Sequence, residues 1–220
     1  MLEILSESER PMSILQLAEA LDVHRSIAYR ILRTLESHGL VKRNESGQVV
    51  LGARLATLAR SVSRTMQAAA LPRLSTIANR LEMTAFLAVL DGSDVVTLVS
   101  VEPIGARLKV AQRPGTHHPV VNGAPGIAIH MALGEDEWRA RFADESTRSP
   151  AEIEEARQRG YATSHDEVIP GLASVAVPLI ISGQQPAALA VVYVGTGIDP
   201  AEIGRVLTEE AAGIRDDLGV

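Results

Sequence analysis

The chain has 220 residues, of which 46% are hydrophobic, 22% charged and only 3% aromatic, and it carries a net charge of −6. This composition is typical of a globular protein with an aliphatic core, and no apolar run approaches the roughly 18 residues that span a bilayer. The absence of cysteine excludes disulfides, thiolate zinc sites and cysteine catalysis. The first residues lack the basic start and apolar centre of a signal peptide, so we expect a cytoplasmic protein with no membrane association.

Charge is unevenly distributed along the chain. Residues 1–67 carry nine Lys/Arg and seven Asp/Glu, a net charge of +2, whereas residues 68–220 carry twelve and twenty, a net charge of −8. The segment HRSIAYRILRTLESHGLVKR (24–43) alone holds five Lys/Arg and one Glu. This asymmetry favours a small polyanion-binding module joined to an acidic body, although an ordinary helix with a solvated basic face produces the same pattern.

The first part of the chain has the pattern of three short helices followed by a hairpin. Apolar residues at helical spacing predict a first helix that Pro11 ends, a second helix that Ser13 caps, and a third helix that ends at Gly39. Two extended runs in VKRNESGQVVL (41–51) flank a polar turn, which predicts a hairpin.

The spacing in QLAEALDVHRSIAYRIL (16–32) matches a helix-turn-helix. Ala18 lies where the two helices would cross, and Asp22 occupies the turn position that needs a positive φ. The second helix would lie in a major groove, with the hairpin as a wing over the DNA backbone. Arg can donate two hydrogen bonds to guanine, and Lys and Arg also bind phosphates. The predicted DNA-binding residues are His24, Arg25, Ser26, Tyr29, Arg30, Arg33, Lys42 and Arg43.

The remaining chain changes from helical to extended patterns. Residues 53–70 contain no Gly or Pro and predict a linker helix, after which Pro72 would lie in the first turn of another helix. Strands are expected in a hairpin beginning at Thr84 and over Arg107–Ala111, Ala173–Ile181 and Pro186–Val194, and helices over 126–133, 135–142, 150–159 and 200–218. Helices around a largely antiparallel sheet define an α+β domain.

The order of these elements resembles the IclR family of bacterial transcriptional regulators. LAEALDVHRSIAYRILRTLESHGLVKR (17–43) followed by GQVVLGARL resembles that family's winged helix and linker start, and GYATSHDEVIPGLASVAVPLI (160–180) resembles its effector-domain signature. The resemblance implies a winged helix-turn-helix domain at 1–52, a linker helix at 53–70 and a GAF-like effector-binding domain at 71–220. It also implies a homodimer, often a dimer of dimers, that binds a pseudo-palindromic operator and a small-molecule effector.

By the same resemblance, NGAPGIA (122–128) matches the glycine-rich segment that lines the effector pocket, where a helix start favours an anionic group. The chain departs from the family in having Ser174 for a Cys, Ser164 for an acid, and Val191 and Tyr193 for serines. The ring of Tyr193 predicts a ligand larger or more apolar than glyoxylate or pyruvate, or one that enters differently; the alternative is that these residues fill a core. The candidate effector-binding residues are Asn122, Gly123, Ala124, Gly126, Ser164, Ser174, Val191 and Tyr193.

Other chemistries have less support in the sequence. His117 and His118 are adjacent, so on an extended segment they point to opposite faces and do not readily share a metal ion. Ser174 has no nucleophile elbow such as GxSxG around it, and we expect no catalytic residue, metal or cofactor. Two alternatives to a DNA-binding sensor remain open: a ligand-binding module whose basic helices mediate dimerisation or contact another protein, and an enzyme on the same scaffold.

Overall fold

The computed structural model describes residues 1–59, 61–106, 110–142, 148–195 and 198–220. The chain divides into two compact units, Met1–Arg64 and Thr65–Val220. The fold is a mixture of helices and strands, as predicted, with a helix-turn-helix in the first unit and an antiparallel sheet in the second. Within the described ranges, no helix combines the length and the hydropathy that crossing a membrane requires.

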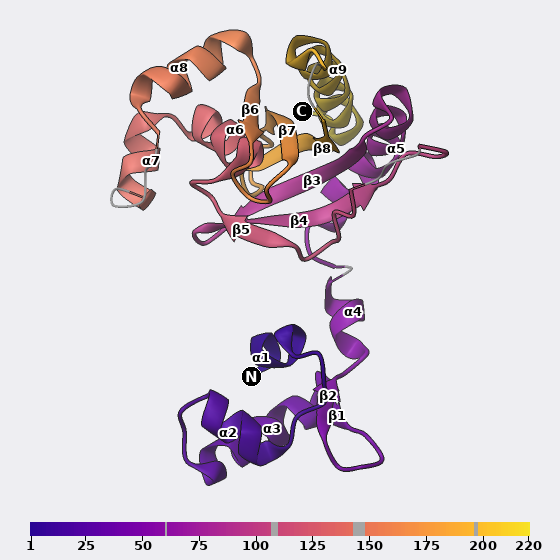
Figure 1. The fold of residues 1–220 in the computed structure, drawn as a ribbon, viewed down its shortest axis with the longest axis vertical. Helices are drawn as coiled ribbons and strands as arrows, with labels where there is room; N and C mark the ends of the chain where they lie inside the picture. Colours follow the sequence, from indigo (N-terminus) through magenta and orange to yellow (C-terminus); the bar gives the residue numbers. More distant parts are fainter. Residues whose placement is uncertain (60, 107–109, 143–147, 196–197) are drawn as a thin grey trace. The chain divides into compact units, whose positions relative to one another are not determined.

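The N-terminal unit is a winged helix-turn-helix (Figure 1). Its elements are α1 (Leu2–Glu7), α2 (Ile14–Ala20), α3 (Arg25–Ser37) and the antiparallel wing strands β1 (Val41–Arg43) and β2 (Val49–Leu51). The small core takes one buried side chain from each of α1, α2, α3, β1 and β2, namely Leu5, Leu17, Leu32, Val41 and Val49. Because all five elements contribute to it, this core fixes the orientation of α3 relative to the wing.

The local signals read from the sequence are present in this unit. Ser13 and Gln16 form a capping box at the start of α2, in which each side chain accepts from the other's backbone amide. Asp22 adopts a φ of 51° in the turn before α3, and Gly39 adopts 67° after that helix. The predicted turn positions therefore have the left-handed conformation that the helix-turn-helix needs.

The expected linker helix over 53–70 is interrupted. Arg54–Ala59 forms α4 and Arg64–Leu81 forms α5, while Ser63 just before α5 has a φ of 46°. Pro72 lies inside α5 rather than in the first turn of a separate helix. A proline inside a helix costs about 3 kcal/mol, and the packing of an apolar helix face outweighs that cost here. The buried side chains of α5 are Met66, Ala70, Leu74, Ile77 and Ala78, whereas α4 fully buries none of its own.

The C-terminal unit is built on a six-stranded antiparallel sheet with strand order β5-β4-β3-β8-β7-β6. Its strands are β3 (Thr84–Asp91), β4 (Asp94–Val101), β5 (His117–Pro119), β6 (Ala162–His165), β7 (Leu172–Leu179) and β8 (Ala187–Val194). The two predicted hairpins are β3–β4 and β7–β8. The expected run Arg107–Ala111 falls mostly on residues 107–109, which lie outside the described residues.

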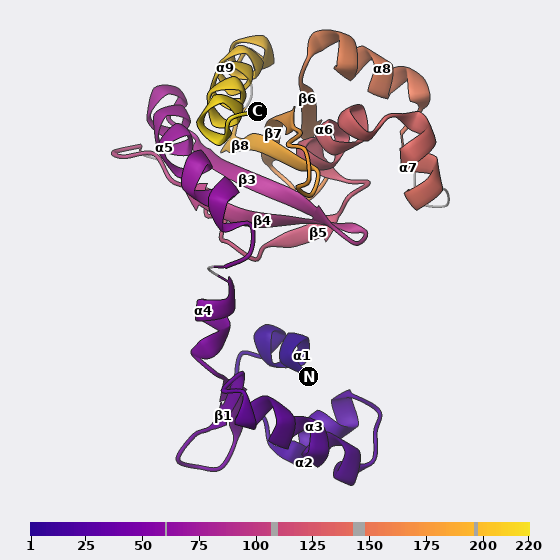
Figure 2. The ribbon, with the colours of Figure 1, turned by 180° about the vertical axis from the view of Figure 1, so that it is seen from behind.

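Helices cover both faces of this sheet, as Figures 1 and 2 show. One face packs on α5 and α9 (Pro200–Leu218), and the other on α6 (Gly123–Leu133), α7 (Glu135–Phe142) and α8 (Pro150–Arg159). Neighbouring residues of a strand belong to different cores: Leu87 faces α5 and α9, whereas Phe86 and Ala88 face α6. Because both faces are buried, β3 is a continuous apolar run without visible alternation.

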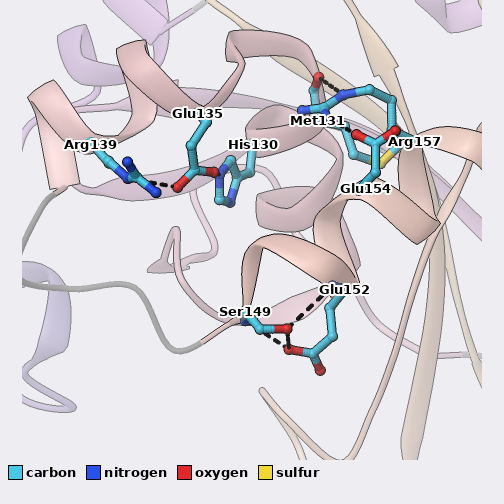
Figure 3. A network of polar contacts seen from close by, with 8 residues as sticks. All are labelled: His130, Met131, Glu135, Arg139, Ser149, Glu152, Glu154 and Arg157. Atoms are coloured by element: carbon cyan, nitrogen blue, oxygen red, sulfur yellow. Dashed lines mark hydrogen bonds and ion pairs between the residues drawn. The ribbon is translucent and has the colours of Figure 1, made fainter.

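A polar network connects α6, α7 and α8 (Figure 3). The ring of Trp138 stacks on buried His130, with 3.9 Å between centroids and 7° between planes. The Nε2 atom of His130 lies 3.3 Å from Glu135 Oε2, and Arg157 Nε donates to the carbonyl oxygen of Met131 at 3.3 Å. Burial lowers the pKa of His130 more than the nearby Glu135 carboxylate raises it. The imidazole is therefore neutral at pH 7 and packs as part of the core.

Candidate nucleic-acid interface and effector pocket

The predicted DNA-binding residues all lie on the surface of the N-terminal unit. Ala28 and Leu32 are fully buried and hold one face of α3 against the core. Every predicted contact residue on α3 and the wing is exposed, namely His24, Arg25, Ser26, Tyr29, Arg30, Arg33, Lys42 and Arg43. The helical period that buries one face therefore presents a basic face on the other side.

The predicted contact residues within α3 lie on two parts of its surface. Ser26, Arg30 and Arg33 are separated by four and three residues, so they share one face of the helix. Tyr29 is directed toward the wing, where the Arg43 guanidinium carbon lies 5.9 Å from its ring centroid. The outward face and the wing-facing edge can therefore contact different parts of a duplex.

His24 has a structural role at the start of α3. Its Nδ1 atom accepts from the backbone amide of Ser26 at 3.3 Å and lies 2.8 Å from Ser26 Oγ. This N-cap satisfies one of the free amides of the first helical turn. His24 therefore has a capping function in addition to its predicted contact with DNA.

A groove separates α3 from the wing. Its lining residues are Tyr29, Arg33, Glu36, Ser37, Val41, Lys42 and Arg43. Glu36 Oε1 accepts from Arg43 Nε at 2.9 Å, which ties the wing to the helix. Cations on both walls make the groove suitable for a polyanion backbone.

The C-terminal unit contains a cavity of about 60 Å³ against the α6-facing side of the sheet. Its walls come from β3, β6, β7 and β8, from the start of α6, and from the segments before α6 and after β6. The lining is mostly apolar with a few polar side chains, the usual character of a small-molecule site. The lining residues are Phe86, Gln112, Thr116, His118, Gly123, Pro125, Ser164, Glu167, Val168, Ile169, Leu172, Ala173, Ser174 and Val192.

The first amides of α6 already have acceptors within the chain. Gly123 N donates to Glu167 Oε2 at 2.8 Å, and Ala124 N donates to Ser164 Oγ at 2.9 Å. The Glu167 carboxylate also forms an ion pair with Arg148. A carboxylate therefore occupies the helix start where the sequence predicted an anionic ligand group, but it belongs to the protein itself.

His118 adds a titratable group to the cavity wall. Burial lowers its pKa, although a hydrogen bond with the Pro119 carbonyl and the charge of Asp94 act in the opposite direction. The imidazole is therefore neutral at pH 7, and because its Nδ1–H donates to the Pro119 carbonyl oxygen at 3.1 Å, its Nε2 atom is left as an acceptor.

Only part of the predicted effector set reaches this cavity. Gly123, Ser164 and Ser174 line it, and Ala124 contributes through its bond to Ser164. Asn122 is the N-cap of α6, without a side-chain capping bond, and lies outside the lining. Gly126 also lies outside the cavity lining and packs against the backbone of Val120.

The glycine at Gly126 is required by packing rather than by a ligand. A Cβ atom at this position would lie 1.9 Å from the carbonyl oxygen of Val120, which is backbone and cannot turn aside. Its missing side chain therefore admits the preceding segment of the same protein, and a contact of Gly126 with an effector stays a prediction.

Val191 and Tyr193 face the opposite side of the sheet from the cavity. Both belong to the core against α5 and α9, while Val192 between them lines the cavity. Neighbouring residues of a strand point in opposite directions, so this cavity receives Val192 and not the two predicted residues, whose contact with an effector stays a prediction. Tyr193 instead lines a separate pocket of about 550 Å³ together with residues such as Met83 and Val194, and its influence on the size of the ligand stays a prediction.

Several residues of the cavity were not predicted from the sequence. Glu167, Val168 and Ile169 follow β6, and Phe86 and Val192 belong to the two central strands. Ser174 pairs with Val192 across β7 and β8, so both residues point to the same side of the sheet. Ser174 was a predicted cavity residue, and the cross-strand pairing identifies Val192, not Val191 or Tyr193, as the residue of β8 on the same side of the sheet.

A winged helix-turn-helix joined to a unit with a buried small-molecule pocket has the architecture of a transcriptional regulator that also senses a ligand. Residues 1–45 match the IclR helix-turn-helix domain, and residues 59–209 match the domain described as bacterial transcriptional regulator IclR C-terminal. The chain therefore belongs to the IclR family of bacterial transcriptional regulators, with an N-terminal DNA-binding domain and a C-terminal effector-binding domain.

Relatives and solved structures agree with this family. The chain is 29% identical to a probable transcriptional regulator, SauR, of Cupriavidus necator over 81% of this chain and 77% of that protein. It is 28% identical to the glycerol operon regulatory protein of Streptomyces coelicolor over 98% and 89%. An IclR regulator of Alicyclobacillus acidocaldarius superimposes with a TM-score of 0.83 at 29% identity over 98% and 94%. The fold is shared with an IclR homologue of Microbacterium hydrocarbonoxydans complexed with 4-hydroxybenzoate, with a TM-score of 0.82 at 23% identity over 99% and 95%.

Proposed function

We propose that this regulator binds a pseudo-palindromic operator as a homodimer, in the cytoplasm, and that a small molecule in the C-terminal cavity changes its affinity for that DNA. The observation that supports this proposal most directly is the exposed basic surface of α3 and the wing, held by a single core. Two-fold symmetry of the dimer would match two half-sites one helical turn apart, or multiples of a turn.

The proposed contacts divide into two groups. Arg25, Ser26, Tyr29 and Arg33 read base edges, and Arg30, Lys42 and Arg43 bind phosphates. In functional terms, residues 1–52 bind DNA, 53–70 link the domains and 71–220 bind the effector. Ligand binding changes DNA affinity only if the ligand prefers one of two dimer arrangements, and we propose the linker as the transmitting segment.

Fluorescence anisotropy tests the DNA-binding part of the proposal. The purified protein is titrated into duplex DNA taken from upstream of its own gene and into a scrambled duplex of equal length, at two salt concentrations. We expect tighter binding to the upstream duplex and a loss of affinity at the higher salt, because phosphate contacts release counterions. Weak binding without preference or salt dependence would instead favour a basic surface that serves dimerisation or a protein partner.

Neighbouring residues of β8 test the effector pocket. The protein–DNA complex is screened with glyoxylate, pyruvate and 4-hydroxybenzoate, the last because a related structure contains it. Val192→Phe would fill the cavity and abolish the response to an active compound, whereas Tyr193→Phe, on the opposite face, would preserve it. The same loss in both variants would contradict this location of the site.

A further inference from the structure

Glu36 is an acid in the groove that is proposed to receive a DNA backbone. The groove is otherwise lined by cationic, neutral polar and aliphatic side chains and by Tyr29, and the Glu36 side chain is only 20% exposed. Its carboxylate lies 2.9 Å from Arg43 Nε and 4.0 Å from an Arg33 terminal nitrogen. A negative charge at this position opposes phosphate binding, so its presence between two cations needs a functional explanation.

The contact with Glu36 also determines where Arg43 points. The carboxylate engages the Nε edge of the guanidinium, and the Tyr29 ring lies 5.9 Å from the guanidinium carbon. Among the described residues, the two terminal nitrogens of Arg43 have no hydrogen bond to another side chain. Glu36 therefore holds Arg43 through its Nε atom while both terminal nitrogens stay available as donors, and Arg43 loses less side-chain freedom when it binds.

These two effects act differently on random and specific DNA. Affinity for random duplex follows the number of phosphates that the protein neutralises, and Glu36 offsets part of that positive charge. On the operator, base contacts fix the register of the protein, so the phosphate contact of Arg43 is made in one direction, which Glu36 supports, whereas random duplex is bound in many registers. We propose that Glu36 is a specificity-determining residue that weakens binding to random duplex while it positions Arg43 for the operator. This inference rests on the proposed DNA-binding function.

The test compares the full-length wild type with Glu36→Gln on a random-sequence duplex across a salt series. Gln has the same shape but no charge. We expect the variant to bind random duplex about fivefold more tightly at low salt, with a slope of log K against log salt about one unit steeper. On the DNA upstream of its own gene the gain is smaller, so the ratio of specific to random binding falls.

Two further variants separate the effect of the negative charge of Glu36 from the effect of its place in the groove. Glu36→Asp keeps the charge on a shorter side chain, and its random-duplex affinity should stay near that of the wild type. Glu3→Gln removes the same charge from an exposed position on α1, outside the groove, and should change little. If circular dichroism shows that Glu36→Gln is misfolded, Glu36→Ala removes the charge with a better helix former.

The outcomes distinguish the two proposals. Random-duplex binding by Glu36→Gln that is no tighter than that of the wild type overturns the role of Glu36, as does an equal gain in Glu3→Gln. If the wild type binds neither duplex at any salt, the proposed function fails and the inference fails with it. A gain confined to the Glu36 variants that lose the charge supports both.

Discussion

The two units of the chain differ in how their candidate sites relate to secondary structure. In the N-terminal unit, one helix carries most of the interface, and its exposed face is the reverse of the face that Ala28 and Leu32 bury. In the C-terminal unit, the cavity takes residues from strands, a helix start and connecting segments that are far apart in sequence. The exposed face of a single helix can therefore be predicted from the spacing of its apolar residues. In a sheet covered on both sides, both faces are apolar, so the sequence pattern does not indicate which face lines a cavity.

The largest expected effect is a loss of stability caused by the close backbone contact at Gly126 in the C-terminal unit. Gly126→Ala should lower the free energy of unfolding by about 3 kcal/mol or more, because the new Cβ meets the Val120 carbonyl oxygen at 1.9 Å. Urea unfolding followed by circular dichroism measures the loss. Gly213→Ala is the matched control, since the nearest atoms to its Cβ belong to the Arg73 guanidinium, a side-chain end that can move at the cost of its ion pairs with Glu210 and Asp217. An equal loss in both variants would contradict the explanation.

The next effect concerns the recognition surface of α3. Arg25→Ala should weaken binding to the upstream duplex by about 1–3 kcal/mol and binding to scrambled duplex by less, because a base contact is lost. Anisotropy titrations on both duplexes provide the measurement. Arg10→Ala removes an exposed cation outside α3 and the wing and serves as the control. Equal losses on the two duplexes would assign Arg25 to the phosphates instead.

The free energy of unfolding should depend on pH through two histidines of the C-terminal unit, half-buried His118 and buried His130. Burial holds the pKa of His118 and of His130 below the ordinary value of 6.5. Below pH 6.5 the unfolded chain therefore binds protons that the folded unit does not, and the free energy of unfolding falls until the pH passes the lower folded-state pKa. The slope is at most about 1.4 kcal/mol per pH unit for each histidine. Urea unfolding from pH 7.5 to 5 measures this slope, and an unchanged slope in His118→Gln would refute that residue's contribution.

The smallest expected effect lies in the turn of the helix-turn-helix. Asp22 has a φ of 51°, a conformation that glycine adopts without steric cost. Asp22→Gly should therefore raise the thermal stability of the N-terminal unit slightly, by less than about 1 kcal/mol. Thermal unfolding, rather than DNA affinity, is the appropriate measurement, because the substitution also removes a negative charge. A clear destabilisation would show that the Asp22 side chain contributes a contact of its own.

The sequence predicted elements whose signals are local. The helix over 150–159 agrees with α8, which begins at a capping box of Ser149 and Glu152, and the helix over 200–218 agrees with α9. The short strands β5 and β6 were not predicted, because three or four residues at the ends of a sheet depend on their pairing partners.

The two candidate sites could be predicted from the sequence to different extents, because the repeat of side-chain direction differs between a helix and a strand. On α3, Ser26, Arg30 and Arg33 are exposed because one helical period determines burial, whereas Arg25, seven residues before Leu32, is exposed at the first position of the helix. On β8, the predicted residues Val191 and Tyr193 lie one position to either side of Val192, which lines the cavity. Because side chains of a strand alternate between two faces, a shift of one residue changes the face. The bond between Gly123 and Glu167 joins residues 44 positions apart, and only the folded sheet brings them together.

The stacked pair of Trp138 and His130 also gives the protein a built-in optical reporter. Trp138 is the only tryptophan of the chain, and it is buried in the core between α6 and α7 of the C-terminal unit. The N-terminal unit therefore contributes nothing to the tryptophan emission directly. A change in that emission when duplex DNA is added would report an altered environment in the C-terminal unit, so an unlabelled titration tests whether DNA binding has an effect there.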